Sequence, residues 1–298
     1  VPWRESPETT EVLARVDALG PVWRERARSL DEGVEFPHEN FAEAEAAGLH
    51  ALCLPTDYGG AGWWLPGRFS PWYKVLERMA RWETNTAQLL QVHNHAAGII
   101  AFHSTPEQRD RFLPDIAGGA FCASLGSEAH LYENGAEILE SELTRVEGGY
   151  RLTARKGFAS VAAAAKYLMV WCAVEGDTPY ASRMVFAVVE VDWEGVELLD
   201  DWQMLGMRST ISCGVKFDEV FVPDSHVVGT PGGWVTDDQR TFSCAYAANH
   251  LGSAQGAFDF LAGYIGQRPD LAESEAVRVK LGQMDAQLFA ARSCLYAT

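Results

Sequence analysis

The order in which hydrophobic patterns change along this chain constrains its fold more than any other feature. From Glu8 to about Gly118, apolar residues recur at spacings of three and four, which predicts helices. After Gly119 come short runs rich in Val, Tyr, Phe and Thr, separated by turn residues, which predict strands. From Asp237 the helical spacing returns. We therefore expect an α+β protein with a strand-rich middle between two helical parts.

These changes predict three domains, at residues 1–118, 119–232 and 233–298. The middle one is expected to be an antiparallel sandwich or barrel, with strands at 150–154, 166–174, 183–191 and 214–222. Helical patterns cover 72–98, and Thr105 followed by Pro106 predicts a helix start. The last apolar stripe is still running at Thr298, so we expect further C-terminal helices or a second subunit to cover it.

Composition excludes several classes of function. A formal charge of −17 leaves no basic surface for nucleic acid. The six cysteines show no metal-binding spacing and several lie in apolar runs, so no metal is expected and a reducing, cytoplasmic compartment is favoured. No apolar run approaches the roughly 18 residues that span a bilayer.

Four motifs occur in one order along the chain. Residues 41–62 end in Pro-Thr-Asp-Tyr-Gly-Gly-Ala-Gly, and 104–114 read Ser-Thr-Pro-Glu-Gln-Arg-Asp-Arg-Phe-Leu-Pro. Residues 205–210 read Leu-Gly-Met-Arg-Ser-Thr, and 215–223 read Val-Lys-Phe-Asp-Glu-Val-Phe-Val-Pro. Together they resemble the acyl-CoA dehydrogenase superfamily, including its dibenzothiophene-monooxygenase-like flavin monooxygenases. The resemblance implies a helical domain, a β domain and a C-terminal helical bundle that is incomplete in this chain.

The resemblance also implies a flavin, FAD or alternatively FMN. The family places an aromatic residue against the flavin and a hydroxyl near its N5 atom, which correspond to Phe158 and Ser160. The segment 121–128 resembles a flavin-binding loop, with Leu125 and Ser127 as contacts, although the residues after Glu128 depart from the pattern. Arg268 is the nearest match to an arginine that contacts FAD of a neighbouring subunit, in an expected homodimer or homotetramer.

A dehydrogenase needs a carboxylate that removes the α-proton of an acyl thioester. At one family position for this base the chain carries Gln239, which cannot accept the proton, and the other position would lie after Thr298. The catalytic residue is therefore unknown. By resemblance, the substrate pocket is expected to include six residues: Leu90, Gln91, His93, Asn94, Arg208 and Arg240.

Three functions follow. The first is α,β-dehydrogenation of an acyl-CoA, with hydride transfer to FAD and electrons passed to an acceptor. The second is a monooxygenase that receives reduced flavin from a reductase, favoured by Phe-Ala-Ser at 158–160 and by histidines at 93 and 95. The third is a non-catalytic subunit of a hetero-oligomeric dehydrogenase.

Overall fold

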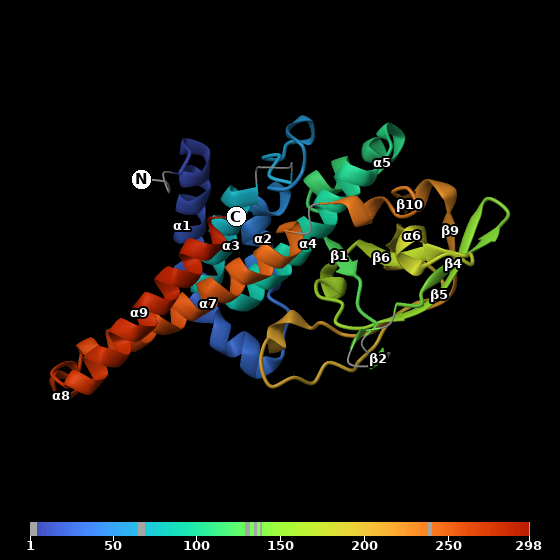
Figure 1. Cartoon of the computed structure of the whole chain (residues 1–298). Coiled ribbons are helices and arrows are strands. Elements are labelled where there is room, and N and C mark those ends of the chain that lie inside the picture. Colours follow the sequence, from blue (N-terminus) through green and yellow to red (C-terminus); the bar gives the residue numbers. More distant parts are fainter. Residues whose placement is uncertain are drawn as a thin grey trace.

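The computed structural model describes residues 5–64, 69–128, 132–133, 136–137, 139–237 and 240–297, and describes only the backbone of 132–133, 136–137 and 240–242. The helices α1, α3, α7 and α9 gather on one side of the molecule and the sheet lies on the other, with α4 between them and α5 and α6 beside the sheet (Figure 1). One connected hydrophobic core runs from the first helix through the sheet to Leu295. The predicted boundaries at 118 and 232 stay predictions.

The N-terminal part is helical, as predicted. Its helices are α1 (Pro7–Gly33), α2 (His38–Ala46), α3 (Phe69–Trp82), α4 (Thr84–His103) and α5 (Pro106–Ala117), with 3-10 turns η1 (Leu49–Ala51) and η2 (Thr56–Tyr58). The predicted start at Thr105 is a capping box with Gln108. The region 72–98 is two helices rather than one, because Glu83 turns out of helical geometry and its carboxylate accepts the amides of Asn85 and Thr86.

The glycine-rich segment between α2 and α3 is a tight turn. A Cβ on Gly60 would lie 2.1 Å from the carbonyl oxygen of Leu54, so no larger residue fits without moving the backbone. This turn carries Leu52 and Cys53 against α4, where Asn94 accepts the amide of Cys53.

The middle part is one large sheet. Its strands are β1 (Cys122–Leu125), β4 (Glu142–Val146), β5 (Gly149–Lys156), β6 (Tyr167–Val174), β7 (Met184–Glu190), β8 (Val196–Leu198), β9 (Val215–Pro223) and β10 (Val227–Val228). Over the described residues the order is β10-β7-β6-β4-β5-β9-β8, with β1 also paired to β6. Two short strands, β2 (Tyr132–Glu133) and β3 (Ala136–Glu137), pair separately.

The middle part was predicted to be antiparallel, and the structure corrects this for two strand pairs. Both β1 and β4 run parallel to β6, whereas the other pairs are antiparallel. Parallel pairing needs a long connection, and other strands lie between β1 and β6 in the chain. The apolar run at 166–174 predicts a buried strand, but it does not predict whether the strands paired with it run parallel or antiparallel.

The C-terminal part consists of α7 (Arg240–Gly266), α8 (Pro269–Ala272) and α9 (Glu275–Leu295). The helix α7 packs closely on α3, since a Cβ on Gly252 would lie 2.1 Å from the Glu77 carbonyl oxygen. Along the predicted stripe of α9, Leu295 is buried, Leu288 is half-buried and Met284 is exposed. The predicted oligomer stays a prediction.

Candidate functional site

The candidate site lies where two strands share one edge of β6. Residues 122–125 of β1 pair with 167–170, and residues 142–143 of β4 pair with 173–174. Trp171 lies between these two stretches, and its indole N–H donates to Ser124 Oγ at 3.0 Å. The chain after β1 turns away at Gly126, where a Cβ would approach the Trp171 ring to 3.5 Å. The interrupted edge therefore leaves room beside Trp171.

A cavity of about 390 Å³ opens there. Its walls come from α4, from β1 and the residues after it, from the residues before β4, from the segment after β5, from β6, from the 3-10 turn η6 (Gly233–Thr236) and from α7. The lining residues are Gln91, Val92, His95, Ser124, Gly126, Ser127, Leu139, Phe158, Trp171, Trp234 and Tyr246. Ligand pockets commonly measure about 300–1,000 Å³, so this cavity has the size of a small-molecule site.

One wall of the cavity is aromatic. The His95 ring stacks on Trp171 at 6.2 Å with an interplanar angle of 21°, and Trp234 crosses Trp171 edge-on at 4.9 Å. Burial lowers the pKa of His95 to about 3. Its imidazole is therefore neutral near pH 7, and no cationic acid is available from it. Burial also raises the pKa of Tyr246, so its phenol stays protonated.

Phe158 separates this cavity from a second one. The second cavity measures about 230 Å³ and includes Trp202, Met204 and Ser212. The Phe158 side chain is 50% exposed and its backbone adopts φ +52°, the left-handed region. The strand β5 ends at Lys156, before the segment that carries Phe158. A half-exposed ring held in strained backbone between two cavities is a surface suited to another planar group.

The segment that carries Phe158 is tied on both sides. The Gly157 amide donates to the Ser127 carbonyl at 2.8 Å, and the Ala159 amide donates to the Cys213 carbonyl at 3.0 Å. These bonds join the end of β1 to the segment after η4 (Arg208–Thr210). Three chain segments from distant parts of the sequence therefore position one aromatic ring.

A buried ion pair holds the residue that directly precedes the Phe158 segment. Lys156 Nζ lies 2.7 Å from Glu128 Oε1, and neither side chain is more than 3% exposed. Glu128 also accepts the amide and hydroxyl of Ser141 and the amide of Glu140. Burial raises the pKa of Glu128, but Lys156 and the hydrogen bonds outweigh burial and hold this pKa below its ordinary value. Glu128 is therefore ionised and ties β5 to the residues after β1.

The fold that carries this site matches known proteins. Residues 16–120 match the family model "Acyl-CoA dehydrogenase, N-terminal domain". The butyryl-CoA dehydrogenase of Megasphaera elsdenii superposes with a TM-score of 0.88 over 99% of this chain and 79% of its own, at 20% identity. The chain has the acyl-CoA dehydrogenase fold. The resemblance predicted from the motifs is thereby confirmed.

Relatives of this acyl-CoA dehydrogenase fold perform two kinds of reaction. The dibenzothiophene monooxygenase of Rhodococcus qingshengii is 27% identical over 83% of this chain, and the 2-methylacyl-CoA dehydrogenase of Solanum tuberosum is 26% identical over 84%. The chain spans about 60% of the length of these relatives. A Paenibacillus sp. A11-2 protein solved with FMN and indole superposes with a TM-score of 0.83 over 96% of this chain and 74% of its own, at 24% identity.

The structure separates the residues predicted on α4. Gln91 lines the main cavity, and Asn249 Nδ2 lies 3.3 Å from its Oε1. His93 does not line it: its Nδ1 accepts the Cys122 amide at 2.9 Å, so its Nε2–H donates to the His50 carbonyl at 2.9 Å. The Asn94 side chain donates to the Leu49 carbonyl and accepts the Cys53 amide. Leu90 is fully buried.

The remaining predicted residues lie in several places. Ser127 lines the main cavity, whereas Leu125 is fully buried in β1. Arg208 pairs with Asp31 at the end of α1, 3.3 Å from Nε to Oδ2. Arg268 directly precedes α8 and stacks over Tyr264, and α8 lies at the far tip of the α7–α9 pair (Figure 1). The predicted contact of Arg268 with FAD of a neighbouring subunit stays a prediction. Gln239 lies outside the described residues, as does the side chain of Arg240.

Sequence reasoning missed part of the site. Trp171, Trp234 and Tyr246 were not predicted, and His95 was considered only beside His93. A tryptophan inside the aliphatic run of β6 was the one available signal. Trp234 and Tyr246 follow the strand region, and only the fold brings them to α4.

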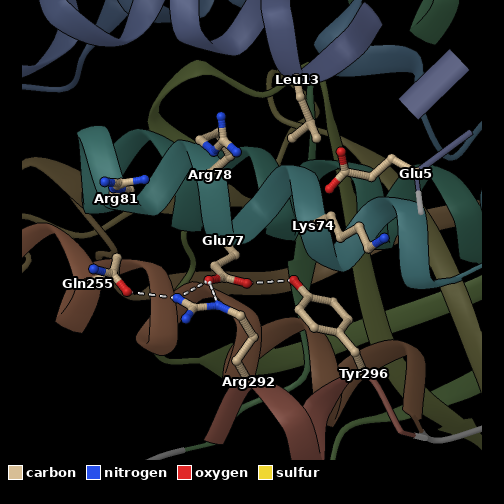
Figure 2. A pocket seen from close by; sticks show the side chains of 9 residues that line it. All are labelled: Glu5, Leu13, Lys74, Glu77, Arg78, Arg81, Gln255, Arg292 and Tyr296. Carbon is tan, nitrogen blue, oxygen red and sulfur yellow. Dashed lines mark hydrogen bonds and ion pairs between the residues drawn. The ribbon is translucent and has the colours of Figure 1, made fainter. Parts of the chain in front are cut away.

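A second feature, a charged cavity of about 350 Å³, lies among α1, α3, α7 and α9. Figure 2 shows Glu77 at its centre, where it accepts Arg292 Nε at 2.7 Å and the Tyr296 hydroxyl at 2.6 Å. Arg292 also donates to Gln255 at 2.8 Å. These bonds join α3, α7 and α9, so we interpret this cavity as part of the helix packing.

In the described part of the chain, no helix has the length and apolar character needed to cross a bilayer.

Proposed function

We propose that this protein is a flavin-dependent monooxygenase that acts on a planar aromatic substrate and receives its reduced flavin, FMN or FAD, from a reductase. The observation that carries this proposal is the aromatic cavity with a neutral histidine in its wall. Trp171 and Trp234 give this wall flat apolar faces, and the neutral imidazole of His95 adds no charge to it. This combination suits a flat apolar substrate.

The residues around Phe158 fit a flavin. The exposed ring offers a stacking surface, and the Ser160 hydroxyl lies two residues further along the same segment. We infer that Phe158 packs on the flavin ring, that Ser160 meets its N5 edge, and that Gly126 and Ser127 approach it with their backbone. When bound, reduced flavin would supply the electrons that activate dioxygen. Similarity to the FMN-bound Paenibacillus protein supports the assignment.

The chain's own residues then have distinct tasks. Trp171 and Trp234 orient the substrate and exclude water from the cavity. His95 holds one proton on its neutral ring and places an N–H or a lone pair toward the reacting atoms, without the charge that burial disfavours. Gln91 supplies an amide at the α4 wall.

A second candidate is dehydrogenation of an acyl-CoA. It is favoured by the TM-score of 0.88 with butyryl-CoA dehydrogenase and by the similarity to 2-methylacyl-CoA dehydrogenase. It requires a carboxylate that faces the flavin and takes the α-proton of the thioester.

One experiment separates the candidates. The protein is reconstituted with FMN or FAD and titrated without oxygen with a panel of acyl-CoAs, while flavin absorbance is followed. We expect no bleaching, and we expect oxygenated product when pre-reduced flavin, air and indole or dibenzothiophene are combined. Bleaching by a thioester would establish the dehydrogenase instead. Failure to retain any flavin would favour the non-catalytic subunit.

A further inference from the structure

Three hydroxyl groups form a continuous hydrogen-bonded chain beneath the Phe158 segment. Ser160 Oγ lies 2.7 Å from Ser212 Oγ, and Ser212 Oγ lies 2.8 Å from Thr210 Oγ1. Thr210 Oγ1 in turn lies 2.8 Å from the carbonyl oxygen of Met207. We call these three side chains the hydroxyl relay. Ser212 also lines the second cavity, which Phe158 shares with the main cavity.

The chemistry at one end fixes the direction of every proton in the relay. A carbonyl oxygen can only accept, so Thr210 donates its single hydroxyl proton to Met207. Thr210 must then accept from Ser212, which uses the only hydroxyl proton of Ser212. Ser212 can therefore only accept from Ser160. The Ser160 hydroxyl proton therefore points to Ser212, and Ser160 can offer a ligand only the lone pairs of its oxygen, as an acceptor.

Burial protects this arrangement. All three side chains are buried, with exposed fractions of 8% for Ser160, 5% for Ser212 and 2% for Thr210. Bulk water therefore has little access to the three hydroxyls and does not replace their hydrogen-bond partners. No charged side chain takes part in the relay, which therefore keeps its direction as pH changes.

We propose that the hydroxyl relay makes Ser160 an obligate hydrogen-bond acceptor and thereby gives the site a preference for reduced over oxidised flavin. This inference rests on the proposed placement of flavin beside Phe158. Oxidised flavin presents a bare nitrogen at N5, which needs a donor, whereas reduced flavin presents an N–H there. An obligate acceptor at Ser160 pairs with the N5–H of reduced flavin and leaves the N5 nitrogen of oxidised flavin without a donor.

The preference agrees with an enzyme that takes reduced flavin from a separate reductase and releases it after oxidation. It also assigns positioning roles to Ser212 and Thr210, which act through Ser160. One hydrogen bond made or lost in a shielded site corresponds to about a threefold to tenfold change in affinity.

The test measures dissociation constants of oxidised FMN and of dithionite-reduced FMN under anaerobic conditions, with the whole protein. We expect the wild type to bind the reduced form more tightly. Ser212→Ala releases the Ser160 proton to point at the ligand, so the ratio of oxidised to reduced dissociation constants should fall about threefold to tenfold. Thr210→Val should shift the ratio in the same direction, and it serves as a second variant if Ser212→Ala folds poorly.

Ser209→Ala is the matched control. Ser209 lies in the same turn, is 1% exposed, and its Oγ is a buried atom for which the described residues offer no hydrogen-bond partner. Its removal should leave the ratio unchanged. Ser160→Ala should abolish the preference, and adding Ser212→Ala to it should change the ratio no further.

Two failures are distinguishable. If Ser212→Ala weakens both redox forms equally, the serine is merely structural and the hydroxyl relay is refuted, while the flavin site stands. If the wild type binds neither form of FMN or FAD, the proposed function fails. A midpoint potential of bound FMN measured in parallel should fall by about 30 mV for each tenfold change in the ratio.

Discussion

Replacing Lys156 by methionine tests how the flavin segment is held. The substitution keeps the length of the side chain and removes its charge, leaving Glu128 ionised at a site where it is about 3% exposed. Breaking a buried ion pair by removing one partner costs about 3–5 kcal/mol. Glu128 keeps its three bonds from Ser141 and Glu140, so we expect the lower part of that range, about 3 kcal/mol at pH 7.5.

The pH dependence of this loss has a definite sign. In the wild type the pKa of Glu128 is lowered, so its contribution to stability is present above the unfolded value of about 4.3 and is lost as pH falls through the folded pKa. Without Lys156, burial raises that pKa and the carboxyl accepts a proton as pH falls. The cost of Lys156→Met should therefore shrink by up to about 1.4 kcal/mol per pH unit below the raised pKa.

The assay is urea denaturation of the wild type and the variant at pH 7.5 and pH 5.0. The double variant Lys156→Met with Glu128→Gln carries no buried charge and should recover most of the loss at pH 7.5. A difference between wild type and single variant that is equal at both pH values, or a double variant no more stable than the single one, would refute this account of the pair.

Four further predictions follow from the site and the helix packing. Phe158→Ala should weaken FMN binding about threefold to tenfold, measured by fluorescence titration, whereas Phe158→Tyr should bind like the wild type. His93→Phe should lower the free energy of unfolding by about 2 kcal/mol or more, because it leaves the Cys122 amide and the His50 carbonyl without their hydrogen-bond partner. His95→Phe should mainly reduce turnover. Equal effects of the two variants on turnover would contradict the different roles of the two histidines. Burial lowers the pKa of both histidines to about 3, so wild-type stability should decline as pH falls below about 6.5, and a flat profile from pH 7.5 to 5.0 would count against their burial. Glu77→Gln should destabilise the protein by about 1–3 kcal/mol by loosening Arg292, seen as a lower urea midpoint.

The broad fold was predictable because local signals agree with one another. Thr105, Pro106 and Gln108 define a helix start that the structure realises as a capping box. The apolar run of 166–174 is a buried strand. The break at Glu83 was not predicted, since its cause is a side chain that caps the next helix and leaves the periodicity almost unchanged.

The site was less predictable, because its geometry depends on packing between distant segments. His93 and His95 lie two residues apart, and only the docking of η1 and β1 decides that the first is used by the backbone and the second faces the cavity. Phe158 and Ser160 could be named from a motif. The left-handed backbone at Phe158, and the partner that Ser212 gives to Ser160, could not.

In the function proposed above, the cavity beside Phe158 brings reduced flavin and an aromatic substrate together. This proposal is tested most directly by a single turnover in which the protein with reduced FMN is mixed with isotopically labelled dioxygen and indole or dibenzothiophene. We predict labelled oxygen in the product, and loss of that product in His95→Phe. Absence of label from the product, together with bleaching of oxidised flavin by an acyl-CoA, would contradict the claim.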